Sequence, residues 1–63
     1  MATKNKGMTQ FDAVGIAEGF IEATREEQVQ AWQYLHDSGL AYRLQGFFGR
    51  TAQSLIEQGI INA

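Results

Sequence analysis

The sequence predicts a small all-α domain of three helices that associates as a homodimer or a higher homo-oligomer. Three observations predict this fold class: the 63 residues include no proline, apolar residues recur at spacings of three and four, and strand-like alternation and hairpin dipeptides are missing. A chain of this length forms at most one domain, and without cysteine it cannot be stabilised by a disulfide. We therefore expect a flexible N-terminal tail over residues 1–8 and a single helical domain over residues 9–63.

The first helix is predicted over residues 10–22. The Thr9 hydroxyl can cap its first turn. Its apolar residues are Phe11, Val14, Ile16, Ala17, Phe20 and Ile21. Gly15 and Gly19 each cost about 1 kcal/mol of helix propensity relative to alanine. Two explanations remain open: the glycines let another helix approach closely, or this segment is partly unwound until it packs.

The second helix is predicted over residues 25–37. Thr24 and Glu27 have the spacing of a capping box, in which each side chain accepts from the backbone amide of the other. Val29, Trp32 and Leu35 form an apolar stripe at helical spacing. Ser38-Gly39 ends the helix, because glycine readily adopts the left-handed backbone conformation found after helix C-termini.

The third helix is predicted over residues 40–58, with Gly59 as its C-terminal cap. Its buried face, at helical spacing, consists of Leu40, Leu44, Phe47, Phe48, Thr51, Ala52, Leu55 and Ile56. Gly46 and Gly49 weaken its middle, so either the helix continues or it kinks or breaks near residues 46–49. The apolar pair Ile60-Ile61 must pack against this core or against another chain.

The net charge of −2 is unevenly distributed. Residues 1–7 have two lysines and no acid, whereas residues 8–37 have six acids against Arg25 alone. The acidic N-terminal half of the chain repels phosphate groups, which argues against nucleic acid as the main partner. Its acidic residues are also too sparse for a protein that mimics DNA. Nothing approaches a membrane span of about 20 apolar residues, and the first residues lack a secretory signal. We expect a cytoplasmic protein with no membrane partner.

The candidate catalytic and metal-binding residues are too few, and too far apart in the sequence, to predict an active site or a metal site. His36 is the one histidine, and its neighbour Asp37 points about 100° away on a helix. Three glutamates cluster at residues 22–27, but a helix start uses carboxylates for capping, and one histidine is too few for a zinc site. Residues 46–51 lack the ending of a phosphate-binding loop. We therefore expect no enzyme activity, no cofactor and no metal.

An aromatic-rich surface is the remaining candidate for function, since five aromatic residues lie within residues 32–48. Three short helices cannot bury all of them together with the aliphatic stripe, which favours self-association, most simply as a two-fold dimer. Aromatic anchors and arginines dominate interface hot spots, and glycines permit close backbone approach. The predicted partner-binding residues are Trp32, Tyr34, Tyr42, Arg43, Gly46, Phe47, Phe48, Gly49 and Arg50.

Part of the chain is similar to a known family. The residues that carry the resemblance are Leu35, Asp37, Ser38, Gly39, Leu40 and Ala41, followed by Leu44, Gln45, Gly46, Phe48, Gly49, Arg50, Thr51 and Ala52. This pattern resembles a family of very short tailed-phage proteins, common in cyanophages, whose function is unknown. The resemblance covers about half of the chain and implies an origin rather than an activity. Phage proteins of this size commonly bind a host protein and inhibit or redirect it.

We therefore expect a non-enzymatic phage protein that self-associates and binds a host protein of unknown identity through its aromatic and arginine surface. Two alternatives remain. One is a small DNA-binding or transcription-regulating protein that uses residues 40–58. The other is a sponge for a nucleotide signal, with a pocket between protomers lined by Tyr42, Arg43 and Arg50.

Overall fold

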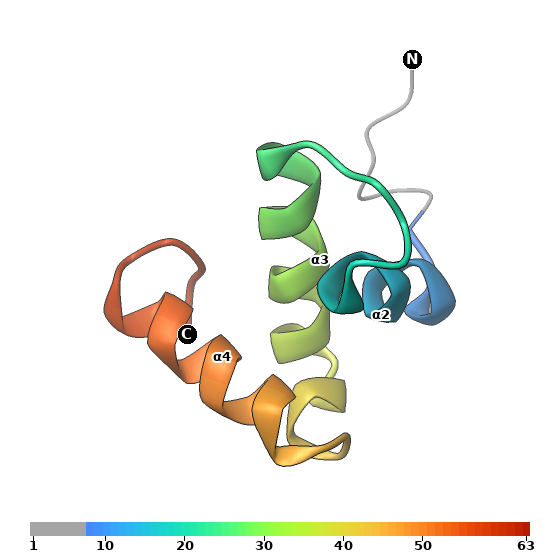
Figure 1. Cartoon of the computed structure of the whole chain (residues 1–63). Helices are drawn as coiled ribbons and strands as arrows, with labels where there is room; N and C mark the ends of the chain where they lie inside the picture. Colours follow the sequence, from blue (N-terminus) through green and yellow to red (C-terminus); the bar gives the residue numbers. More distant parts are fainter. Residues whose placement is uncertain (1–7) are drawn as a thin grey trace.

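The computed structural model describes residues 8–63 and shows an all-helical fold, with no strand in that range (Figure 1). Its elements are α2 (Gln10–Glu18), α3 (Arg25–Asp37), the short 3₁₀ helix η1 (Leu40–Tyr42) and α4 (Gly46–Glu57). The predicted all-α fold is confirmed. The tail predicted over residues 1–8 lies, apart from Met8, outside the described residues. Met8 is partly buried and packs against the core.

Helix α2 begins where the sequence predicts and ends earlier. Thr9 Oγ1 accepts from the backbone N–H of Asp12 (3.1 Å), whose carboxylate accepts from the N–H of Thr9 (3.3 Å). The helix ends at Glu18 rather than at residue 22, because Gly19 turns into the left-handed region with a φ of 87°. The expected helix over 10–22 is therefore four residues too long at its C-terminus.

The two glycines of the first helix have different roles. Gly19 supplies the left-handed conformation that ends the helix. Gly15 makes room for Ile21: a Cβ added at position 15 would lie 2.5 Å from Cδ1 of Ile21. The close neighbour of Gly15 is therefore the chain that returns over α2 after the turn, and not another helix.

Helix α3 has the predicted bounds. Its capping box is present, with Thr24 Oγ1 accepting from the N–H of Glu27 (3.1 Å) and Glu27 Oε1 accepting from the N–H of Thr24 (2.9 Å). Gly39 follows its C-terminus with a φ of 80°. The buried side of α3 contributes Leu35, whose side chain is fully enclosed. This helix is the central element, with α2 on one side of it and α4 on the other (Figure 1).

The helix predicted over residues 40–58 is divided. One turn of 3₁₀ helix, η1, is followed by residues 43–45, and α4 begins at Gly46 after the extended backbone of Gln45 (φ −62°, ψ 155°). Of the two possibilities left open by the sequence, a continuous helix or a break near residues 46–49, the structure shows a break, and it lies just before this region, at residues 43–45. Gly49 lies beside η1, but a Cβ there would meet Cδ1 of Tyr42 at 3.4 Å, which is an ordinary van der Waals contact, so the packing of η1 on α4 does not require a glycine. The helix ends at Glu57, and the predicted cap Gly59 has a φ of 77°.

All four elements and the C-terminal tail contribute to one hydrophobic core. Its buried residues are Ala13, Ala31, Trp32, Leu35, Ala41, Phe48, Ala52 and Ile61. Ile61 therefore packs back on the core of its own chain. The Gln33 side chain holds this tail in place: its Oε1 accepts from the N–H of Asn62 (2.8 Å) and its Nε2 donates to the Asn62 carbonyl (2.9 Å).

Candidate functional site

The structure divides the predicted partner-binding residues between the core and the surface. Trp32 and Phe48 are buried, and their ring centroids lie 5.9 Å apart. Tyr34 and Gly49 are intermediate in exposure. The remaining five are exposed and lie at the junction of η1 with the first turns of α4. We call this group the η1–α4 corner; it comprises Tyr42, Arg43, Gly46, Phe47 and Arg50.

Phe47 is an exposed ring on a fixed support. It remains 43% exposed, yet its ring packs edge-on against Trp32 at 6.1 Å and against Phe48 at 4.8 Å. Both supporting rings belong to the core. The exposed part of Phe47 is therefore held in place before any partner arrives, which lowers the entropy lost on binding.

Tyr42 is fixed at the corner by two polar contacts. Nε2 of Gln53 donates to the Tyr42 hydroxyl (2.9 Å), and the same hydroxyl shares a hydrogen bond with Nδ1 of His36 (2.6 Å). The His36 and Tyr42 rings also meet edge-to-face, with centroids 5.6 Å apart. These contacts join α3, η1 and α4, so the position of the Tyr42 ring depends on all three elements.

The two arginines of the corner are exposed and form no ion pair within the described part of the chain. The guanidinium of Arg50 folds back over the start of α4, since a Cβ at position 46 would lie 2.9 Å from its Nη1. Gly46 thus leaves space for Arg50 at the surface. Because Arg43 and Arg50 have no internal carboxylate partner, both can donate to carboxylates of another molecule.

The residues considered for catalysis do not come together in one site. His36 contacts Tyr42, whereas the Asp37 carboxylate accepts from Gln33 (3.0 Å). Within residues 8–63, no group of three or more histidine, cysteine, aspartate or glutamate side chains could hold a metal ion. Nor does any helix in this range have the length and apolar character needed to cross a membrane.

Two exposed phenylalanines were missed by the sequence reasoning. Phe11 and Phe20 were assigned to the apolar face of the first helix, but they are 79% and 83% exposed. For Phe11 the sequence did contain a signal, because the apolar side chains of residues 10–18 surround the helix rather than forming one stripe. Phe20 lies in the bend after the end of α2, so the helical pattern does not apply to it. A helix with apolar side chains on every side, packed on one neighbour, must expose some of them.

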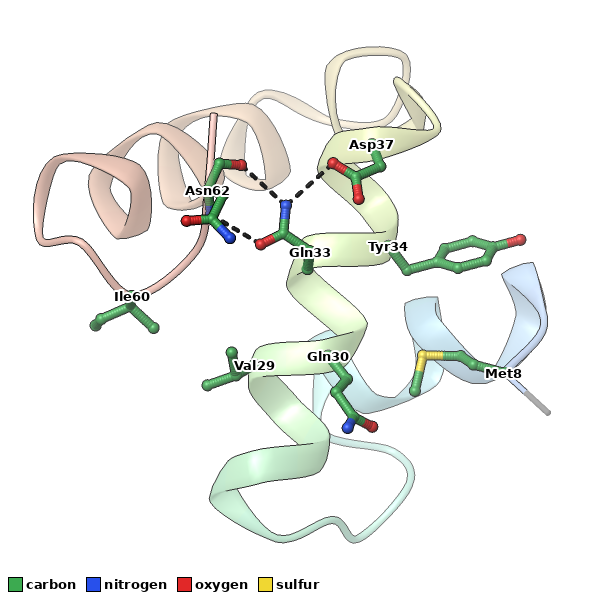
Figure 2. Close-up of a pocket in the computed structure, with 8 residues that line it drawn as sticks. All are labelled: Met8, Val29, Gln30, Gln33, Tyr34, Asp37, Ile60 and Asn62. Atoms are coloured by element: carbon green, nitrogen blue, oxygen red, sulfur yellow. Dashed lines mark hydrogen bonds between the residues drawn. The ribbon is translucent and has the colours of Figure 1, made fainter. Parts of the chain in front are cut away.

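A groove runs along α3 between the C-terminal tail and the start of α2, with a volume of about 320 Å³ (Figure 2). Its lining residues are Met8, Val29, Gln30, Gln33, Tyr34, Asp37, Ile60 and Asn62. A smaller hollow of about 160 Å³ lies between α3 and α4, with Arg25, Trp32 and Leu55 among its lining residues. Neither hollow is lined by Arg43 or Arg50, the arginines considered for a nucleotide pocket.

Comparison with known proteins identifies a family. Neither a curated protein nor a solved structure matches the chain. A family model described as a domain of unknown function, DUF7417, matches residues 14–63. The matched range contains α3, η1 and α4 completely, and with them every residue of the η1–α4 corner. The chain therefore belongs to the DUF7417 family.

Proposed function

We propose that this chain is a small non-enzymatic phage protein that binds a host protein through its η1–α4 corner and thereby modulates or inhibits it. The observation that carries this proposal is the half-exposed Phe47 ring, held on Trp32 and Phe48 beside the exposed Arg50. Rigid aromatic anchors flanked by arginine are the features that most often dominate protein interfaces. The phage origin and the host cytoplasm as the site of action rest on the sequence resemblance of residues 35–52.

The charge of the corner suggests the chemistry of the partner surface. Arg43 and Arg50 offer planar donors that can each engage a carboxylate in a bidentate geometry. We infer that the partner presents aspartate or glutamate side chains around an apolar depression that receives Phe47. The Tyr42 ring, 45% exposed, extends the apolar contact at the edge of this surface.

We also propose that the protein self-associates, through α2. The sequence favours self-association because three short helices cannot bury five aromatic rings together with the aliphatic stripe. The structure supports a related argument at a different place, since Phe11 and Phe20 are the most exposed large apolar side chains among the described residues. A second copy covering α2 and the bend that follows it would remove both rings from water while leaving the η1–α4 corner free for the host protein.

The test is affinity purification of the tagged chain from a bacterial host, with mass spectrometry of the proteins that remain bound. We expect one host protein at a fixed ratio, and we expect Arg50→Glu to lose it while the circular dichroism spectrum stays unchanged. Arg25→Glu is the matched control, because it makes the same charge change at an exposed residue on the first turn of α3. If Arg50→Glu retains the same protein, the corner is not the binding surface.

The two alternative functions give distinct results. Binding to random duplex DNA that weakens steeply with added salt would favour a DNA-binding protein that uses residues 40–58. A rise in the melting temperature with one member of a nucleotide panel would favour the nucleotide sponge, because a ligand of the folded state alone raises the melting point. Either result, without a host protein retained, would overturn the proposal.

A further inference from the structure

The hollow of about 160 Å³ between α3 and α4 combines apolar walls with a single charged side chain. Trp32 belongs to the core and exposes only 8% of its surface, so the fold holds its ring in place on one wall. Arg25 supplies the only charge among the described residues that line the hollow. The other lining residues are Gln28, Val29, Thr51, Leu55 and Ile60, and none of them belongs to the η1–α4 corner.

The position of Arg25 is not explained by the stability of α3. It lies in the first turn, where the positive end of the helix dipole disfavours a cation. Its side chain is exposed and forms no ion pair within residues 8–63. The acids of the same turn, Glu26 and Glu27, do not line the hollow. An anion that enters the hollow therefore meets an unpaired cation, and no described carboxylate stands on its walls.

The charge and the aromatic wall lie at different places along the hollow. Arg25, Val29 and Trp32 are spaced by four and three residues, so they lie on one side of α3. Thr51 and Leu55, four residues apart on α4, line the same hollow. At 1.5 Å per residue, Trp32 lies about 10 Å further along the axis of α3 than Arg25. A ligand that uses both groups therefore needs an apolar part and, at a short distance from it, an anionic part.

The volume of the hollow limits what it can hold. Sites for drug-sized ligands have volumes of about 300–1,000 Å³, which is well above the 160 Å³ found here. An apolar cavity of about 150 Å³ holds one benzene molecule. The hollow therefore has room for one six-membered ring, and an aromatic ring gains a favourable contact with the Trp32 indole.

We propose that this hollow binds a small free carboxylic acid that carries one aromatic ring. The ring packs against Trp32 and Leu55, and the carboxylate accepts hydrogen bonds from the guanidinium of Arg25. Charge complementarity and size select this occupant, because one unpaired cation matches one anionic group and the volume admits one ring. Since no residue of the η1–α4 corner takes part, this site is independent of the host protein proposed above.

The probe is 3-phenylpropionate, titrated into the full-length chain labelled with ¹⁵N. The chain has one tryptophan, so the indole N–H signal of Trp32 reports on the hollow without ambiguity. We expect this signal to shift with a dissociation constant of about 1 mM, the range of a ligand of this size, and the affinity to fall with added salt. The neutral analogue 3-phenylpropanamide should bind about threefold more weakly, as for the loss of one exposed ion pair. Acetate, which lacks the ring, should leave the Trp32 signal unchanged.

Variants of the chain separate the charge from the apolar contact. Arg25→Gln removes the cation, so the acid and the amide should then bind equally. Arg43→Gln is the matched control, because it removes an exposed arginine outside the hollow that forms no ion pair among the described residues, and the acid should keep its threefold advantage. Thr51→Phe fills the hollow with a ring of the chain itself and should abolish binding of both compounds. If Thr51→Phe fails to fold by circular dichroism, the comparison of the two arginine variants still decides, since both residues are exposed.

Three results would overturn the inference. The first is no shift of the Trp32 signal at high millimolar acid, and the second is equal affinity for the acid and the amide in the unchanged chain. The third is binding of acetyl-Gly-Gly-Phe, with its free carboxylate, that is about tenfold tighter than that of the acid, which would assign the hollow to the end of a protein chain. Arg50→Glu, which tests the corner, should not change the affinity for the acid, so failure of the hollow and failure of the corner are distinguishable.

Discussion

Replacing Tyr42 by phenylalanine tests how the η1–α4 corner is held. The hydroxyl is the meeting point of Gln53 from α4 and His36 from α3, at 2.9 Å and 2.6 Å. Tyr42→Phe removes both hydrogen bonds but keeps the ring and its edge-to-face contact with His36. The change therefore isolates the polar part of the link between α3, η1 and α4.

The expected loss is about 1 kcal/mol of the free energy of unfolding. A net intramolecular hydrogen bond contributes about 0.5–1.5 kcal/mol, and two of them would reach about 1–3 kcal/mol. Tyr42 is 45% exposed and Gln53 is exposed, so water can replace the lost partners and the lower end of this range applies. For a domain of this size, a loss of about 1 kcal/mol lowers the melting temperature by about 4–8 °C.

The assay is urea denaturation followed by circular dichroism, with Tyr34→Phe as the matched control. The Tyr34 hydroxyl has no hydrogen-bond partner among the described residues, so its removal should change the free energy of unfolding by less than about 0.5 kcal/mol. The double variant with Gln53→Ala should lose less than the sum of the two single variants. Equal losses for Tyr42→Phe and Tyr34→Phe would refute the reasoning.

Three further substitutions probe the core, a turn and the C-terminal tail. Leu35→Ala should cost about 2–5 kcal/mol, because its side chain is fully enclosed, and much of the chain should then be unfolded by circular dichroism at room temperature. Gly19→Ala should cost about 1–2 kcal/mol in urea denaturation, since nothing crowds the site and the loss comes from the φ of 87° alone. Gln33→Leu should release the tail, and the backbone N–H of Asn62 should then exchange with solvent faster while that of Leu35 stays protected.

The parts of the fold that could be predicted from sequence are those with strong local signals. Helix α3 has the predicted bounds because Thr24 and Glu27 form a capping box at one end and Gly39 supplies the left-handed turn at the other. The start of α2 at Thr9 follows from the same capping chemistry. These signals act within four residues, so no tertiary contact is needed to interpret them.

The divided third helix shows where local signals fail. Residues 40–58 have no proline, and their helical spacing of apolar residues continues through the break. Tertiary contacts accompany the interruption: the Tyr42 hydroxyl shares a hydrogen bond with His36 on α3 and accepts one from Gln53 on α4. Helical periodicity identifies the buried face of this segment. It cannot show that its first turn forms a separate 3₁₀ helix in contact with α3.

The sequence predicts which kinds of residue form the candidate site, but it does not predict which of them lie at the surface and which lie in the core. The aromatic and arginine content of residues 32–50 indicates an interaction surface, yet Trp32 and Phe48 are core residues, and only the structure separates them from the exposed Phe47. Neighbours in sequence such as Phe47 and Phe48 point in directions about 100° apart on a helix. Which of the two faces the core depends on the angle at which α4 meets α3.

The exposed rings of Phe11, on α2, and Phe20, in the bend after it, lead to a quantitative expectation for self-association. Covering about 80% of Phe11 and Phe20 in both protomers removes about 600 Å² of apolar surface, which is below the roughly 1,200 Å² of a small stable interface. We therefore expect a weak dimer, with a dissociation constant in the micromolar range or weaker, visible as a concentration-dependent mass in analytical ultracentrifugation.

The double substitution Phe11→Ser and Phe20→Ser should leave a monomer with an unchanged melting temperature at low concentration, because neither ring supports the core. Arg43→Ser, at an exposed corner residue that forms no ion pair among the described residues, is the control and should leave the association intact. A chain that remains monomeric at millimolar concentration would show that α2 is not a self-association surface, and the exposed phenylalanines would then require a different partner.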